Sequence, residues 1–191
     1  MGSAALAFRP VTRDSIATFE AFFNTPGAPK HCWCMVWRRS TQESHNHTPA
    51  DRKCQMMARI RDGVPVGLIA YRDDEPVGWV SVAPRETYRN LGGPPAAPGE
   101  VIWSIACFYV PRKLRGQGLV HQLIAGAVEH ARAEGATVVE AYPVDIDAPS
   151  YRFMGFVPVF LAAGFADHGM AGARRHVMRL RLGRALFDTA V

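Results

Sequence analysis

Residues 101–120 read VIWSIACFYVPRKLRGQGLV, and an amphipathic segment continues from them to residue 134. The first ten residues are almost wholly apolar, which is typical of a strand buried on both faces of a sheet. Pro111 has no backbone donor and ends that strand. The stretch predicts a buried strand, a turn with glycines, and a helix over 118–134 that Gly135 ends. The apolar residues at helical spacing are Val120, Leu123, Ile124, Ala127, Val128 and Ala131.

The turn between this strand and this helix is suited to binding an anion. The first turn of a helix has backbone N–H groups without intrahelical partners, and these carry the positive end of the helix dipole. Gly116 and Gly118 let the backbone approach a ligand closely. Arg112, Lys113 and Arg115 add positive charge around the turn. The residues therefore predict a pyrophosphate site.

Two other classes of phosphate-binding protein fit this turn poorly. A Rossmann fingerprint needs three glycines in the pattern GxGxxG, and only Gly116 and Gly118 are present. A P-loop needs Gly-Lys followed by Ser or Thr, which the turn lacks. The strand also follows a predicted hairpin and does not open a βαβ unit.

The remaining pattern predicts one domain over residues 1–191, since no linker interrupts it. The order of elements is β, α, α, β, β, β, α, β, α, β, with loops over 25–48, 84–99 and 145–150. Besides 101–110 and 118–134, we expect strands over 5–11, 65–72, 76–83, 137–144 and 175–182, and helices over 13–24, 49–62 and 151–163.

Composition narrows the class of partner and the setting. The chain has 191 residues, a formal net charge of +5 and four cysteines. Its Lys and Arg residues are scattered, so we expect no nucleic-acid partner. No run approaches the roughly 20 apolar residues of a membrane span, so we expect no membrane partner either. The cysteine spacing is not that of a disulfide scaffold, which favours a reducing, cytoplasmic setting.

The turn Arg115-Gly116-Gln117-Gly118-Leu119-Val120 resembles the coenzyme-binding loop of the GNAT superfamily of N-acetyltransferases. That family's loop is written Arg/Gln-x-x-Gly-x-Gly/Ala, and Val120 departs from it at the last position. The order of elements over nearly the whole chain is also similar. The resemblance implies an α/β (α+β) fold: a mixed, mostly antiparallel twisted sheet with helices on both faces and a splayed parallel strand pair. The segment 25–62 would lie on the acceptor side.

The resemblance also implies the reaction and the residues that bind acetyl-CoA. The amine acceptor, from a small molecule or a peptide or protein, would attack the thioester of acetyl-CoA directly. The backbone of Phe108, Tyr109 and Val110 would bind the pantetheine arm between strands 101–110 and 137–144. The pyrophosphate would be held by Arg115, Gly116, Gln117, Gly118, Leu119 and Val120.

The catalytic acid and base are less clear from the sequence. Many family members have a tyrosine four residues before a Gly-Phe pair, and here that position is Phe160, which has no proton to donate. Tyr142 and Tyr151 are the nearest candidate acids. Glu140 is the candidate base, because it shares a predicted strand face with Tyr142, and Glu100, which precedes the buried strand, is the weaker alternative. Packed tyrosines, a solvated carboxylate and a chain of water molecules remain alternatives.

A segment rich in cysteine, histidine and aromatic residues precedes the first long helix. Cys32, Cys34, His45 and His47 match no standard zinc spacing, so we expect no metal. Trp33, Met35 and Trp37 belong either to an acceptor pocket or to the core. The alternative function is a non-catalytic acyl-CoA-binding module. The sequence leaves open the acceptor, the length of the acyl group, and whether the protein is a monomer or a homodimer.

Overall fold

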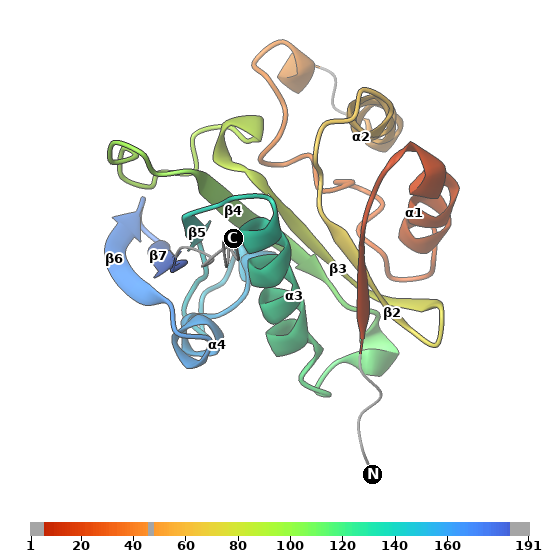
Figure 1. Cartoon of the computed structure of the whole chain (residues 1–191). Helices are drawn as coiled ribbons and strands as arrows, with labels where there is room; N and C mark the ends of the chain where they lie inside the picture. Colours follow the sequence, from red (N-terminus) through yellow and green to blue (C-terminus); the bar gives the residue numbers. More distant parts are fainter. Residues whose placement is uncertain (1–5, 46–47, 184–191) are drawn as a thin grey trace, which may run out of the picture.

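A mixed sheet of seven strands runs through the described part of the chain, residues 6–45 and 48–183, in this computed structural model (Figure 1). Its strand order is β1-β2-β3-β4-β5-β7-β6. Only β4 and β5 pair in parallel, and the other neighbours are antiparallel. The strands are β1 (Ala7–Pro10), β2 (Leu68–Arg72), β3 (Glu75–Pro84), β4 (Ile102–Tyr109), β5 (Val138–Ala141), β6 (Ala166–Ala171) and β7 (Arg175–Arg181).

Four helices cover the two faces of the sheet. Helices α3 (Leu119–Ala133) and α4 (Val157–Ala162) pack on one face, where their apolar residues join one core cluster. Helices α1 (Ile16–Phe23) and α2 (Pro49–Arg61) contribute to a second cluster on the opposite face. Successive residues of β2 alternate between the two clusters, as the pleat of a strand requires.

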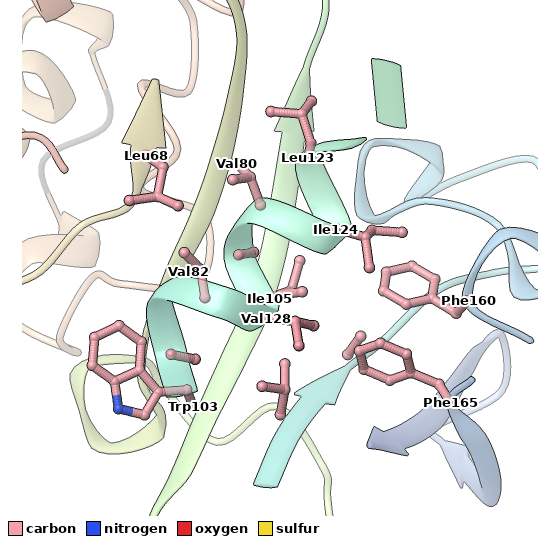
Figure 2. Close-up of a cluster of buried hydrophobic side chains, with 14 of the residues drawn as sticks. Leu68, Val80, Val82, Trp103, Ile105, Leu123, Ile124, Val128, Phe160 and Phe165 are labelled. Carbon is pink, nitrogen blue, oxygen red and sulfur yellow. The ribbon is translucent and has the colours of Figure 1, made fainter. Parts of the chain in front are cut away.

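Helix α3 is held on the sheet by the apolar stripe that its sequence predicts. Leu123, Ile124 and Val128 lie against side chains of β3 and β4, including Val80 and Ile105 (Figure 2). Because the helix begins directly after the turn that follows β4, this packing also fixes the turn against the end of the strand. The core thus positions the predicted anion site.

Strands β4 and β5 pair over only half the length of β4. Their register runs from Ile102↔Val138 to Ile105↔Ala141, and β4 then continues to Tyr109 beside no partner from β5. The register with β3 also shifts here, since Cys107 pairs with Ser81 and Ile105 with Val82. Such a bulge re-aims side chains and is frequent beside active sites. The last residues of β4 therefore have one free edge, which confirms the splayed parallel pair.

Most predicted elements are present, and several expectations are corrected. The strand expected over 65–72 begins at Leu68, and the helix expected over 13–24 begins as a 3-10 turn, Arg13–Ser15, before α1. Strand β5 ends at Ala141 and does not reach residue 144. The helix expected over 151–163 is divided into a 3-10 turn, Arg152–Met154, and α4. Strand β6 was not expected at all, because its residues are mostly exposed and carry no alternating pattern. In the described residues, no helix is long and apolar enough to cross a membrane.

Candidate active site

The turn between β4 and α3 has the geometry that the two glycines predict. Gly116 and Gly118 have φ angles of 77° and 73°, which residues with a side chain rarely adopt. Gly118 is the residue that caps the N-terminus of α3. A Cβ atom at either glycine would meet no atom within 4 Å, so the backbone of the turn is open to a ligand. Arg115 Nε donates to the carbonyl oxygen of Val110 at 3.0 Å and ties the turn to the end of β4.

A cavity of about 530 Å³ extends from this turn along the free edge of β4. We call it the helix cavity, because its far side is formed by the 3-10 turn and α4. Its lining residues are Phe108, Tyr109, Val110, Arg115, Val120, Arg152, Phe153, Gly155, Phe156 and Val159.

A second cavity, of about 560 Å³, lies between the end of β4 and the segment 27–39. We call it the loop cavity. It shares Phe108, Tyr109, Arg115 and Phe153 with the helix cavity. The two cavities therefore meet at the end of β4. The other lining residues of the loop cavity are Gly27, Ala28, Pro29, His31, Cys32, Cys34, Val36, Trp37, Arg39, Arg52, Ser81, Ala106 and Cys107.

The predicted coenzyme-binding residues lie together around the helix cavity and the glycine turn. Five of them line the cavity: Phe108, Tyr109, Val110, Arg115 and Val120. Gly116, Gln117 and Gly118 form the turn, while the side chain of Leu119 is buried in the core and only its backbone is at the helix start. Sequence reasoning missed the opposite wall, 152–159, which shows no periodicity that marks it as part of a site.

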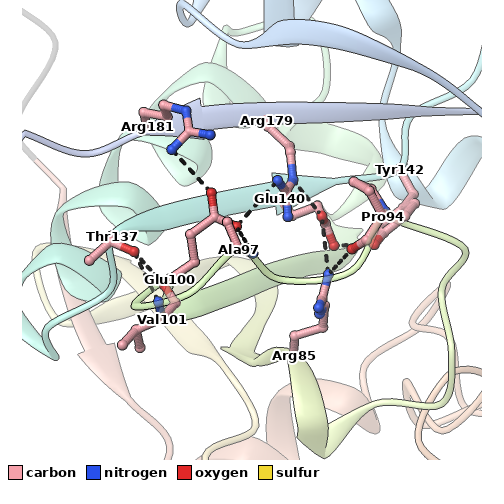
Figure 3. A network of polar contacts seen from close by, with 10 residues as sticks. All are labelled: Arg85, Pro94, Ala97, Glu100, Val101, Thr137, Glu140, Tyr142, Arg179 and Arg181. Carbon is pink, nitrogen blue, oxygen red and sulfur yellow. Dashed lines mark hydrogen bonds and ion pairs between the residues drawn. The ribbon is translucent and has the colours of Figure 1, made fainter.

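The candidate base Glu140, on β5, and the candidate acid Tyr142, directly after β5, form a buried network with arginines (Figure 3). The phenol of Tyr142 donates a hydrogen bond to Glu140 Oε1. Arg179 Nε donates to Glu140 Oε2 at 2.8 Å, and Arg85 Nη1 lies 3.5 Å from the same oxygen. Neither Glu140 nor Tyr142 lines the helix cavity or the loop cavity.

The loop 84–100 closes over this pair. A Cβ atom at Gly93 would lie 2.5 Å from the phenol oxygen of Tyr142 and 2.7 Å from Glu140 Oε1, so only glycine fits there. Burial and the hydrogen bond to Glu140 raise the pKa of Tyr142 well above its ordinary value. The phenol is therefore a poor proton donor in this state, and its proton is already engaged by Glu140.

Tyr151 also lines neither cavity, but its ring contacts residues that do. Its ring centroid is 6.0 Å from that of Trp37, which lines the loop cavity, and 6.3 Å from that of Phe153, which lines both cavities. Phe160 is fully buried and packs against Phe108 and Phe165, with ring centroids 6.1 Å and 5.1 Å apart. It thus acts as a core residue beside the end of β4.

The cysteine- and aromatic-rich segment is divided between core and cavity. Trp33 and Met35 are buried in the cluster under α1 and α2, whereas Trp37 lines the loop cavity. Cys34 Sγ lies 3.3 Å from Cys107 Sγ, and this contact and burial raise the pKa of Cys34 well above its ordinary value. Among residues 6–45 and 48–183, no three His, Cys, Asp or Glu side chains form a group suited to a metal ion, and His47 lies outside that part of the chain.

An open strand edge that leads into a glycine turn at a helix N-terminus is suited to an anionic ligand that carries an extended arm. The model of the family described as "Acetyltransferase (GNAT) family" matches residues 30–156, about two thirds of the chain. The chain therefore belongs to the acetyltransferase (GNAT) family, whose co-substrate is acetyl-CoA. No curated protein matches the chain in sequence.

Solved structures with the same fold include enzymes with different acceptors. AAC(6')-Ib, in complex with paromomycin and acetyl-CoA, is 18% identical with a TM-score of 0.59, over 93% of each chain. The ribosomal-protein-alanine N-acetyltransferase from Brucella melitensis is 21% identical with a TM-score of 0.53, over 92% of this chain and 99% of that one. The GNAT domain of S. lividans PAT is 21% identical with a TM-score of 0.56, over 92% and 89%. At these identities the likeness shows the fold alone.

Proposed function

We propose that the protein is an N-acetyltransferase that moves an acetyl group from acetyl-CoA to a primary amine by direct attack. The observation that carries this proposal is the junction of the two cavities at Phe108 and Tyr109. A direct transfer needs two substrates that enter from different sides and meet at one point. The helix cavity is suited to the coenzyme and the loop cavity to the acceptor.

The coenzyme's position follows from the chemistry of the helix cavity. Its pyrophosphate needs backbone donors and positive charge, which the turn at Gly116 and Gly118 and the guanidinium of Arg115 supply. Its pantetheine arm carries amides, which pair with the free edge of β4 as a short additional strand does. The thioester then lies at the junction of the cavities.

The reaction breaks one carbon–sulfur bond and forms one carbon–nitrogen bond. The amine must first lose a proton, because a free alkyl ammonium has a pKa of about 10.4. Its nitrogen then attacks the thioester carbonyl, and a backbone N–H stabilises the oxyanion. When the intermediate collapses, the nitrogen gives up a second proton, and the coenzyme leaves as a thiolate that takes up one proton. The products are an amide and a free thiol, and one proton is released in total.

Of the three candidate catalytic residues, Tyr151 is the one that we propose as the proton donor. Its aromatic neighbours Trp37 and Phe153 both belong to the walls of the loop cavity. Glu140 as base and Tyr142 as acid stay predictions, and both have competing partners, since Glu140 is paired with Arg179 and Tyr142 with Glu140.

Two measurements test the proposed function. Acetyl-CoA should raise the midpoint of thermal unfolding, because it binds the folded chain alone. Release of free coenzyme A thiol should then appear when a panel of primary amines is added with acetyl-CoA. Stabilisation by the coenzyme without turnover of any amine would favour the non-catalytic binding module. Absence of stabilisation would contradict both.

A further inference from the structure

The charged side chains that line the loop cavity are basic. Arg39, Arg52 and Arg115 line it, and no Asp or Glu is among its lining residues in the part of the chain that the structure describes. The guanidinium of Arg175 also lies over the ring of Trp37, 4.4 Å from its centroid. A cavity of this kind attracts an anion and repels a cation.

Arg39 and Trp37 have hydrogen-bond donors that no group in residues 6–45 and 48–183 satisfies. Arg39 Nε, Arg39 Nη1 and Trp37 Nε1 are all buried and without a partner there. Unpaired buried donors are rare in native proteins, because each forfeits the hydrogen bonds it makes in water. All three atoms are donors, so the missing partner is an acceptor.

The carboxylate nearest to Arg39 in the sequence is already paired. Glu43 accepts hydrogen bonds from Arg59 Nη1 and Nη2, both at 2.8 Å. These bonds from Arg59 lower the pKa of Glu43 to about 2, so it stays ionised and bound to Arg59. The neighbouring Arg38 points into the core instead, where its Nη2 donates to Val66, Ser81 and Tyr88 and its Nε has no partner among the described residues. Arg39 is thus available to a ligand in the cavity.

We propose that the acceptor is an amine that carries an anionic group, a carboxylate or a phosphonate, which binds Arg39 in the loop cavity beside Trp37. This inference rests on the proposed function, because it assigns the acceptor of the same site. The anionic group would bind at Arg39 while the amine reaches the junction at Phe108. A volume of about 560 Å³ is suited to an amino acid or a short peptide end. A polycationic acceptor would be disfavoured by the same arginines.

The experiment compares acceptors that differ only in the anionic group. The pairs are L-methionine with L-methioninamide and 3-aminopropylphosphonate with butylamine, and ribostamycin serves as a polycation. Thiol release gives kcat/KM for each, and calorimetry on the coenzyme A-saturated protein gives Kd for the non-reacting complexes. Both are measured on the wild type, on Arg39→Gln, and on Arg61→Gln as a control that removes one exposed positive charge outside both cavities.

We expect kcat/KM to be higher for each anionic acceptor than for its neutral partner. Arg39→Gln should reduce the ratio of these two kcat/KM values roughly 10- to 100-fold. The ratio between variants cancels differences in amine basicity. Arg61→Gln should keep the ratio, and all three proteins should bind coenzyme A equally. Arg39→Lys keeps the positive charge and should recover part of the ratio, provided that thermal unfolding shows each variant folded.

Three results would overturn the inference: equal use of anionic and neutral acceptors, a preference that survives Arg39→Gln, or loss of coenzyme A affinity in Arg39→Gln. The last would assign Arg39 to the coenzyme. If no amine is turned over but the anionic acceptors still bind through Arg39, the anion site stands and the proposed transfer falls. The two failures are therefore distinguishable.

Discussion

Glu140 on β5 accepts a hydrogen bond from Arg179 on β7 at 2.8 Å, with both side chains almost completely buried. Arg179 Nη1 also lies 3.5 Å from Glu100, whose second oxygen is 3.1 Å from Arg181 (Figure 3). Glu100 thereby joins the end of the loop 84–100 to β7, and Arg85, 3.5 Å from Glu140, joins its start to β5. Because this loop closes over the end of β5, the network shapes the region beside the splayed strands.

Replacing Glu140 by glutamine should lower the free energy of unfolding, even though the substitution hardly changes packing. Glutamine has nearly the same size but removes the carboxylate closest to buried Arg179, which then keeps only the longer contact to Glu100, at 3.5 Å. Removing one partner of a buried ion pair typically costs about 3–5 kcal/mol, and the contact to Glu100 should place the loss toward the lower end of that range. Chemical denaturation measures the free energy of unfolding. Glu129→Gln is the control, because its ion pair with Arg132 is largely exposed and contributes less than about 1 kcal/mol. Similar losses in the two variants would contradict the structural role of Glu140.

Tyr151→Phe and Tyr142→Phe should have different kinetic effects. If Tyr151 gives its proton to the departing thiolate, its replacement lowers kcat about 10²-fold or more and leaves KM for acetyl-CoA unchanged. Tyr142→Phe removes the hydrogen bond to Glu140 and should lower stability by about 1 kcal/mol or more, with kcat largely retained in the folded protein. Steady-state rates with a reactive amine and thermal unfolding test both. A collapse of kcat only in Tyr142→Phe would return the acid role to Tyr142.

His176 should make the stability of the protein depend on pH. Burial lowers its pKa, but hydrogen bonds to Asp167, at 2.8 Å, and to Asp145 outweigh that effect, and the net pKa is raised above 6.5. Since the folded pKa exceeds the unfolded one, this contribution is fully present below about pH 6.5 and is lost as pH rises through the folded pKa.

The measurement is the difference in unfolding free energy between the wild type and His176→Gln, from pH 5.5 to pH 8.5. The extra stability of the wild type should be largest at pH 5.5 and should fall as the pH rises. His121→Gln replaces an exposed histidine and serves as the matched control. If the difference in unfolding free energy between the wild type and His176→Gln grew as the pH rises, the assigned pairing of His176 with Asp167 and Asp145 would be contradicted.

The sequence predicts the centre of the fold better than its edge. The run 101–110 and the stripe on α3 are buried continuously, so their periodicity reflects packing directly. Strand β6 lies at the edge of the sheet, where exposure removes the alternating pattern. The helix expected over 151–163 is interrupted at Gly155, which has a φ of 90° and ends the 3-10 turn. Pro158 lies in the first turn of α4, where its missing N–H suits a helix start and not a helix interior.

The same contrast applies to the site. The coenzyme side is local in sequence, since one strand, one turn and one helix form most of it, and these residues could be predicted. Glu140 and Tyr142 are hydrogen-bonded to each other, but Tyr142 follows the end of β5 and so does not share a strand face with Glu140. The loop that encloses them approaches through Gly93, a contact no local pattern indicates. Arg39 lines the loop cavity only because its segment folds against the end of β4, and nothing in the neighbouring residues of the sequence predicts that position.

The most direct test of the account is calorimetric titration with coenzyme A of the wild type, Gly116→Val with Gly118→Val, and Gly135→Val. All three glycines have positive φ angles and open space around them, but Gly135 lies at the other end of α3. We predict that the double variant loses at least about tenfold in affinity, because side chains then occupy the pyrophosphate site, while Gly135→Val binds as the wild type does. Unchanged affinity in the folded double variant, or no binding by the wild type, would contradict the account.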